Sequence, residues 1–235
     1  MRPRGIRLVV ASVALALAGA LWWLVTWPDV RSIAAANPRT TSFIARYRDH
    51  EEHEAHPHPP EWIWVPYGRI APDLRRAVLC SEDIGFFSHH GFDEDEIRKA
   101  LQDAWEETRT PRGASTITQQ VAKNLWLSPS RNPLRKIKEA LLARELEREL
   151  PKRRILEIYL NVAEFGPGIF GAEAAARHYY GKPASALGSR EAAELAAGLS
   201  RPSMWHPGVE SRAYERQVDR VLGRMSRAAF LDREI

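Results

Sequence analysis

The sequence predicts a mainly α-helical protein, and three observations support this class. Apolar residues recur at helical spacing from residue 93 onward. Prolines and glycines separate these periodic stretches, as expected of residues that end helices. Strand-like alternation of apolar and polar residues is scarce. With 235 residues, 44% of them hydrophobic, the chain is long enough for one well-buried domain and an appendage.

The N-terminal residues have the pattern of a membrane anchor. Three arginines, at positions 2, 4 and 7, precede an uncharged apolar run over residues 8–27 with three tryptophans at its far end. A run of about 20 apolar residues matches the thickness of a bilayer, and indoles favour its interface. The sequence therefore predicts a cytoplasmic tail at 1–7 and a transmembrane anchor at 8–27, with the rest outside the cytoplasm.

A cleaved signal peptide is the alternative to an anchor. The small residues of Ile33–Ala36 would offer a cleavage site. The apolar run is longer than the usual 7–15 residues or so of a signal peptide, which favours the uncleaved anchor.

Weak periodicity over residues 28–61 indicates a solvated juxtamembrane linker. The segment contains four histidines that are candidate metal ligands: His50, His53, His56 and His58. Their H-E-x-H spacing differs from the H-E-x-x-H of zinc proteases, and the prolines that follow would end a helix. We therefore favour a linker over a metal site, and expect the folded domain to span 62–235.

Helices are expected along most of this domain. Their predicted ranges are 93–105, 115–127, 134–150, 152–161, 172–180 and 189–199. Within 134–150, the residues Ile137, Leu141 and Leu150 are expected to face the core. Cys80 is the only cysteine, so no intramolecular disulfide can form, and we expect it to be a buried apolar residue.

An acidic pair is the first candidate for chemistry. Glu82 and Asp83 lie between an apolar segment and Phe86-Phe87. A carboxylate beside aromatic side chains tends to have a raised pKa, which suits proton transfer near neutral pH. The alternative is a helix cap or a solvated pair.

A cationic set is the second candidate. Its members are Lys123, Arg131, Arg135 and Lys136, and Glu139 lies among them. Cations converging from two helices could hold a phosphate or diphosphate. The alternative is an exposed helix face with ion pairs. A P-loop, a G-x-S-x-G elbow, a G-x-G-x-x-G turn and the S-x-x-K and K-T-G elements of penicillin-binding transpeptidases are all absent from the sequence.

Four stretches in order carry a resemblance. They are "EDIGFFSHHGFD" (Glu82–Asp93), "GASTITQQVAKN" (Gly113–Asn124), "RKIKE" (Arg135–Glu139) and "ILEIYLN" (Ile155–Asn161). Together they resemble the motifs of the peptidoglycan glycosyltransferases, glycosyltransferase family 51. The similarity is closest to the monofunctional biosynthetic transglycosylases. Ile84-Gly85 departs from the family, which often has an arginine there.

The resemblance implies a fold, a reaction and a site. The fold would be a lysozyme-like, mainly α glycosyltransferase domain with one N-terminal transmembrane helix. The reaction would polymerise lipid II into β-1,4-linked glycan strands, with inversion at the anomeric carbon and release of polyprenyl diphosphate. Glu82 would be the general base, and Glu139 the second catalytic residue, near the leaving diphosphate. The substrate-binding residues would be Asp83, Ser115, Thr116, Gln119, Gln120, Lys123, Asn124, Arg131, Arg135 and Lys136.

Cofactors, partners and location follow from the same resemblance. No cofactor is required, although a divalent cation such as Mg²⁺ assists some family members. The expected partners are lipid II, the growing lipid-linked strand, membrane lipid and other cell-wall synthesis proteins. The basic pI of about 9.4 suggests an anionic partner, but nucleic acid fits poorly with a domain outside the cytoplasm. The expected location is the inner membrane, with a single pass and a periplasmic catalytic domain.

Two rival functions use the same residues. A non-catalytic protein could bind lipid II or scaffold wall synthesis, and a lytic enzyme could cut glycan strands. Both glutamates and the cationic set argue against the scaffold. Cations directed at a diphosphate would have no purpose in a lytic enzyme.

Overall fold

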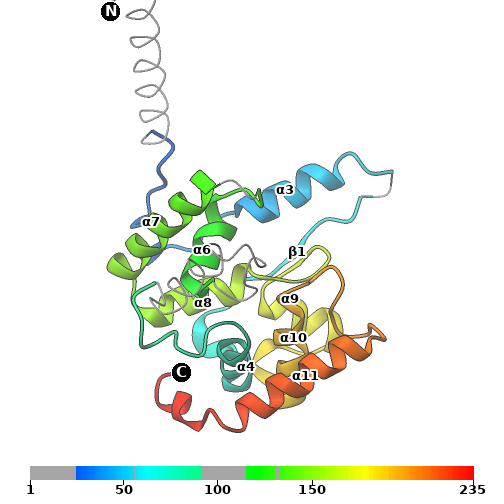
Figure 1. The fold of residues 1–235 in the computed structure, drawn as a ribbon. Coiled ribbons are helices and arrows are strands. Elements are labelled where there is room, and N and C mark those ends of the chain that lie inside the picture. Colours follow the sequence, from blue (N-terminus) through cyan, green and yellow to red (C-terminus); the bar gives the residue numbers. More distant parts are fainter. Residues whose placement is uncertain (1–24, 56, 92–114, 131–132) are drawn as a thin grey trace, which may run out of the picture.

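The computed structural model describes residues 25–55, 57–91, 115–130 and 133–235, which form a mainly helical body (Figure 1). The predicted helix at 93–105, Arg131 and most of the predicted anchor lie outside these residues. Within the described ranges, no helix is both long enough and apolar enough to cross a membrane. The mainly α class is confirmed.

The helices follow one another with short connections. In chain order they are α2 (Ser32–Ala35), α3 (Ser42–Glu51), α4 (Pro72–Glu82), α6 (Ile117–Trp126), α7 (Pro133–Glu149), α8 (Lys152–Val162), α9 (Ala172–Tyr180), α10 (Ser189–Gly198) and α11 (Arg212–Met225). Short 3₁₀ helices cover Tyr67–Arg69, Ala184–Ala186 and Ala229–Arg233.

A small sheet closes one side of the body. Its strands are β1 (Glu61–Trp62), β2 (Glu164–Gly166) and β3 (Ile169–Phe170). The central strand β3 pairs parallel with β1 and antiparallel with β2. Trp62 is fixed further because its indole donates to the carbonyl of Asn161 at 2.7 Å.

The helix boundaries follow local chemistry. Thr116 caps α6 in a capping box with Gln119, and Pro151 directly precedes α8. Gly181 ends α9 in the left-handed conformation that glycine adopts without strain. The helices predicted at 115–127, 134–150, 152–161, 172–180 and 189–199 are confirmed as α6 to α10. The sequence interpretation did not identify α4 and α11.

The packing divides into two groups that share one core (Figure 1). Helix α6 packs on both α7 and α8, whereas α4 packs on α10 and α11. Cys80 on α4 is 2% exposed within this core, as predicted. Because α4 ends at Glu82, it carries that carboxylate from one group of helices toward α6 of the other.

The segment before residue 62 differs from the expected solvated linker. It contains α2 and α3, and it buries Val30, Ile33 and Ile44. The guanidinium of Arg154 donates to the carbonyl groups of Ile33 and Ala36, at 2.9–3.1 Å. Arg154 lies on α8, far along the chain, so the local sequence pattern does not reveal these contacts. The division of the chain at Trp62 remains a prediction.

The core-facing side of α7 also differs from the prediction. Ile137 and Leu141 are 52% and 41% exposed, and only Leu150 is buried as expected. The buried stripe is Leu142, Leu146 and Leu150, which recur every four residues. Helix α7 carries apolar residues on two faces, so its sequence pattern does not distinguish the buried one.

Candidate active site

Glu82 is the last residue of α4, and neighbouring helices hold the end of this helix. The hydroxyl of Ser81 donates to the carbonyl of Ala196 on α10 at 3.1 Å. Arg224 on α11 donates to the carbonyl of Cys80 at 3.0 Å. The backbone that carries Glu82 is therefore fixed by two helices.

The carboxylate of Glu82 has neutral hydrogen-bond partners. The side-chain amide of Gln120 on α6 donates to Glu82 Oε2 at 2.8 Å, and the hydroxyl of Ser81 lies 3.4 Å from Oε1. Desolvation by burial raises the pKa of Glu82, and these two hydrogen bonds offset part of that shift. The negative charge of Asp83 adds to the increase. A carboxyl group in this environment takes up a proton more readily than an exposed glutamate does.

Asp83 has a different environment from its neighbour. Its carboxylate accepts hydrogen bonds from the backbone N–H of Ile117 at 3.0 Å and from His89 Nε2 at 2.9 Å. Ile117 is the first residue of α6, where backbone N–H groups and the helix dipole favour a negative charge. Asp83 therefore fixes the start of α6 against the end of α4.

The start of α6 uses two further residues that were predicted to bind substrate. Thr116 Oγ1 accepts from the backbone of Gln119, and Gln119 Oε1 accepts from the backbone of Thr116, both at 3.3 Å. The Thr116 hydroxyl also donates to the carbonyl of Gly91 at 2.9 Å. Both side chains are about 95% buried, being 4% and 5% exposed. Their hydrogen bonds in the structure are therefore those of a helix cap.

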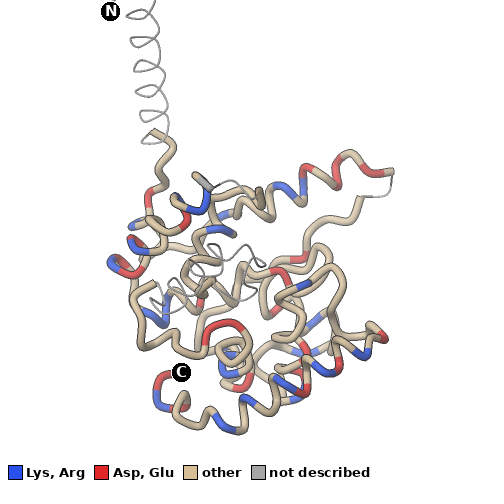
Figure 2. Tube along the Cα trace, in the orientation of Figure 1, with Lys and Arg blue, Asp and Glu red and all other residues tan. Residues whose placement is uncertain are grey.

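A cationic cluster lies where α6 meets the start of α7. We define it as Lys123, Arg135 and Lys136 with the carboxylate of Glu139 between them. Glu139 is 2% exposed and accepts from Arg135 Nη1 on one oxygen and from Lys136 Nζ on the other. Lys136 Nζ also donates to the hydroxyl of Ser115 at 3.0 Å. Lys and Arg positions accordingly gather where α7 runs beside α6 (Figure 2).

Lys123 enters this cluster from α6. Burial lowers the pKa of its ammonium group, and the carboxylate of Glu139 opposes that effect. The charge lies over the ring of Phe43 on α3, with 5.3 Å between Nζ and the ring centroid. Phe43 belongs to the segment expected to be a linker, so the sequence interpretation gave it no role.

Helix α6 joins the two halves of the candidate site. Gln119 faces Lys136, with 3.5 Å between Oε1 and Nζ, whereas its neighbour Gln120 donates to Glu82. Lys123 follows one turn later. Asn124 is half-buried on the same helix. The structure thus brings together most of the predicted residues, and Arg131 lies outside the part of the chain that it describes.

Tyr159 is a residue that the sequence interpretation did not assign to the site. Its hydroxyl donates to Gln120 Oε1 at 3.1 Å, from α8. The only signal was its place in "ILEIYLN", because a tyrosine in an apolar helical run otherwise indicates core packing.

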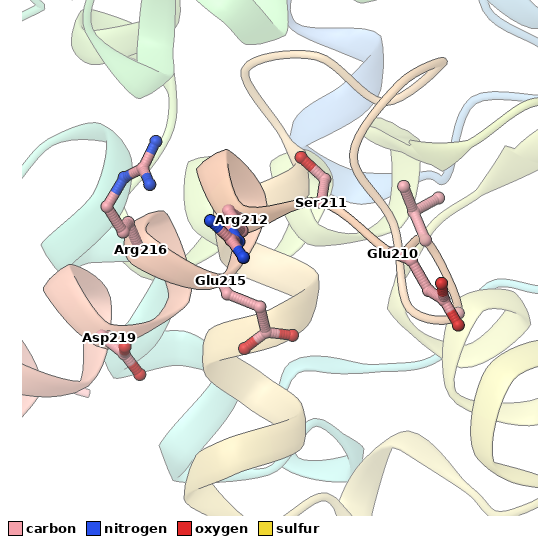
Figure 3. Close-up of a pocket in the computed structure, with 8 residues that line it drawn as sticks. Glu210, Ser211, Arg212, Glu215, Arg216 and Asp219 are labelled. Atoms are coloured by element: carbon pink, nitrogen blue, oxygen red, sulfur yellow. The ribbon is translucent and has the colours of Figure 1, made fainter.

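A separate hollow of about 810 Å³ lies at the start of α11 (Figure 3). Charged side chains line it, including Arg212, Glu215, Arg216 and Asp219, and Glu215 pairs with Arg190. None of the predicted site residues lines this hollow, so it is not the site that the motifs define. Among the described residues, no cluster of three or more His, Cys, Asp and Glu side chains could hold a metal.

Several known proteins are similar in sequence to this chain over most of its length. Residues 50–226 match the family described as Transglycosylase. The biosynthetic peptidoglycan transglycosylase of Azoarcus sp. (strain BH72) is 45% identical over 220 residues, which cover 94% of each chain. The protein with the same description from Laribacter hongkongensis (strain HLHK9) is 42% identical over 231 residues, covering 96% of this chain and 97% of the other. That from Methylobacillus flagellatus is 49% identical over 162 residues, covering 69% and 71%.

The structure places a desolvated carboxylate and a cationic cluster along one helix, α6. The chain belongs to the transglycosylase family and is a peptidoglycan glycosyltransferase. The resemblance drawn from the four motifs is therefore confirmed at the level of family and enzyme class.

Proposed function

We propose that this enzyme polymerises lipid II into linear β-1,4-linked glycan strands, with inversion at the anomeric carbon and release of polyprenyl diphosphate. One observation carries the proposal. Helix α6 contacts both a desolvated carboxyl group, Glu82, through Gln120, and the cationic cluster, through Gln119. The first suits removal of a proton, and the second suits an anionic leaving group.

Glu82 is the general base in this proposal. It takes the proton from the 4-hydroxyl of the acceptor sugar as that oxygen attacks the anomeric carbon of the donor. Its raised pKa brings the group closer to the pH at which it must accept a proton. The hydroxyl of Ser81 lies 3.4 Å from Oε1 and is closer to Ala196, so this oxygen keeps capacity to accept from a substrate.

The cationic cluster stabilises the leaving group. The bond between the anomeric carbon and the diphosphate breaks as the glycosidic bond forms, so negative charge grows on the diphosphate. Fixed cations at that point lower the barrier. Lys123, Arg135 and Lys136 supply them, and Glu139 holds two of them in place. The resemblance to the family implies that Arg131, outside the described residues, also contributes.

The location in this proposal is the inner membrane. Residues 8–27 anchor the chain with the N-terminus in the cytoplasm, and the lysozyme-like domain works on the periplasmic side. Lipid II and the growing strand carry polyprenyl tails, so tethering enzyme and substrates to one surface raises their effective concentration. No cofactor is required in this proposal, and activity is to be measured with and without Mg²⁺.

The test measures glycan synthesis by the full-length chain in detergent. Labelled lipid II is the substrate, gels separate the products, and Glu82→Gln is compared with the unmodified protein. We expect the substitution to lower the rate by about 10²–10⁴, the usual contribution of a general base. Glu164→Gln is a matched control, because burial also raises the pKa of Glu164, on β2. The control should keep nearly full activity.

Two results would redirect the proposal. Folded protein that binds lipid II but makes no strands, with or without Mg²⁺, would indicate a binding scaffold. Release of fragments from finished glycan would indicate a lytic enzyme.

A further inference from the structure

A chain of hydrogen bonds joins three helices at Glu82. The hydroxyl of Tyr159 on α8 donates to Gln120 Oε1 at 3.1 Å, and Gln120 Nε2 donates to Glu82 Oε2 at 2.8 Å. Tyr159 is 1% exposed, so water does not compete for its hydroxyl. The hydroxyl that begins the chain therefore lies inside the core, and the carboxyl group that ends it is the proposed base.

The direction of this chain follows from the chemistry of its members. A buried hydroxyl must donate to an acceptor or lose a hydrogen bond, and the acceptor that the structure provides is Gln120 Oε1. Burial also raises the pKa of Tyr159 well above its usual range, with further contributions from Glu82 and Asp83, so the hydroxyl keeps its proton. The carbonyl end of the Gln120 amide is thus held at Tyr159, and the NH₂ end at Glu82.

An amide held in this way affects the carboxyl group that it faces. An N–H donor stabilises the ionised carboxylate, whereas a carbonyl oxygen in the same place repels it and favours the protonated acid. If the Gln120 amide turned by half a turn, its NH₂ group would face the hydroxyl of Tyr159, and that buried donor would lose its acceptor. Without the hydroxyl, the amide could turn at no such cost. The tyrosine therefore selects the amide orientation that keeps Glu82 ionised.

We propose that Tyr159 is a positioning residue that acts on Glu82 through the side-chain amide of Gln120. This inference rests on the proposed role of Glu82 as general base. Tyr159 contacts no substrate and exchanges no proton in this scheme. Its effect is to set the pH at which Glu82 becomes competent.

Other charged groups near Glu82 are fixed and stay the same in the test. Asp83 adjoins it, and its carboxylate is held by His89 and by the start of α6. Arg224 on α11 binds the carbonyl of Cys80, and from α10 the contact to this end of α4 is the carbonyl of Ala196. Arg76, one and a half turns earlier on α4, pairs with Asp232. The cluster residue Lys123 is one turn from Gln120 on α6.

The experiment compares pH profiles of kcat/KM for lipid II polymerisation by the full-length chain and by Tyr159→Phe. A general base must be ionised, so activity falls as pH drops through the pKa of Glu82. We expect Tyr159→Phe to move this acid limb upward by about one pH unit, the size of one hydrogen bond's net effect. At pH values below both limbs the rate should be about tenfold lower, and at high pH it should approach that of the unmodified enzyme.

Tyr214→Phe is the matched control. Tyr214 is 2% exposed, and its hydroxyl donates to the backbone carbonyl of Glu194 at 3.0 Å. Removing this hydroxyl makes the same chemical change in the core, away from Glu82, and should leave the acid limb in place. A loss of rate that is equal at every pH in Tyr159→Phe, with the limb unmoved, would overturn the proposal.

Gln120→Ala completes the test. It removes the donor to Glu82 and leaves the tyrosine ring in place, so it should also move the acid limb upward, even if Tyr159→Phe fails to fold. In the double variant, Tyr159→Phe should add no further shift, because its effect passes through Gln120. An unmoved limb in Gln120→Ala, or a full additional shift in the double variant, would contradict the proposal.

The Glu82→Gln variant separates this inference from the proposed function. If Glu82→Gln is inactive while the acid limbs of the other variants do not move, Glu82 remains the proposed base and only the role of Tyr159 fails. An active Glu82→Gln would show that Glu82 is not the base.

Discussion

Glu82 and Glu139 are the same residue type in opposite surroundings. Glu139 is held between Arg135 and Lys136, one on each carboxylate oxygen. Glu82 has an amide and a hydroxyl as partners, and burial raises its pKa. Both lie beside α6, so their different environments come from the side chains that contact each carboxylate.

This difference separates two tasks that a glycosyltransferase must perform. A carboxylate that binds two cations, one on each oxygen, keeps those cations in fixed positions. A carboxylate with neutral partners can gain and lose a proton during each cycle. The contrast should also appear in the stability of variants at the two positions.

Glu139→Gln should give the largest change in stability. The substitution leaves Arg135 and Lys136 without their shared counter-ion. Breaking a fully buried pair costs about 3–5 kcal/mol, but Lys136 is 47% exposed, so we expect a loss of about 1–3 kcal/mol. Thermal unfolding in detergent should show a Tm lower by roughly 2–4 °C for each kcal/mol.

An exposed ion pair provides the control for Glu139. Glu215 pairs with Arg190, and both side chains are about half exposed, at 53% and 51%. Glu215→Gln should change the unfolding free energy by less than about 0.5 kcal/mol. Equal effects at the two positions would mean that burial does not distinguish Glu139.

Asp83→Asn should have the next largest effect. Asp83 accepts hydrogen bonds on its carboxylate from Ile117 and His89, and an amide there turns one acceptor into a donor. We expect a loss of about 1–2 kcal/mol in unfolding free energy. Faster amide hydrogen exchange at Ile117 would place that loss at the start of α6. Unchanged exchange there would contradict the capping role of Asp83.

Glu82→Gln should have the smallest effect, with the opposite sign. The folded state raises the pKa of Glu82, so ionising this group disfavours folding at pH values above that pKa. The substitution removes this cost, so at pH 8 the variant should be slightly more stable than the unmodified protein. Below the unfolded pKa, where the carboxyl group is protonated in both states, the gain should disappear. The sign of the stability change is tested by measuring unfolding of both proteins at pH 8 and at a pH below the unfolded-state pKa.

Local signals in the sequence account for much of the fold. Thr116, Pro151 and Gly181 mark helix ends through their own backbone and side-chain chemistry, and α6, α8 and α9 begin or end where they predict. For helix α7, local signals do not predict which face is buried. Its apolar residues cover two faces, and only packing against α6 and α8 selects the face of Leu142.

The candidate site divides in the same way. The motifs predicted Glu82 and every member of the cationic cluster as site residues. They could not show that Asp83 caps α6, or that Tyr159 reaches Gln120, because those partners are 34 and 39 residues apart in the chain. Phe43 was missed for a related reason, since its partner Lys123 is on a different helix.

The segment at residues 28–37 is docked on the helical body, which would limit how far the domain can move from the proposed membrane anchor. A flexible tether over 28–61 would let its ends separate by roughly 30 Å, from the dimensions of a random coil. Here Val30 and Ile33 are buried, and Arg154 binds the carbonyl groups of Ile33 and Ala36. The indole of Trp27 also donates to Glu145 on α7 at 2.7 Å. If residues 8–27 anchor the chain as proposed, this docking would hold the catalytic domain at a nearly constant height above the bilayer.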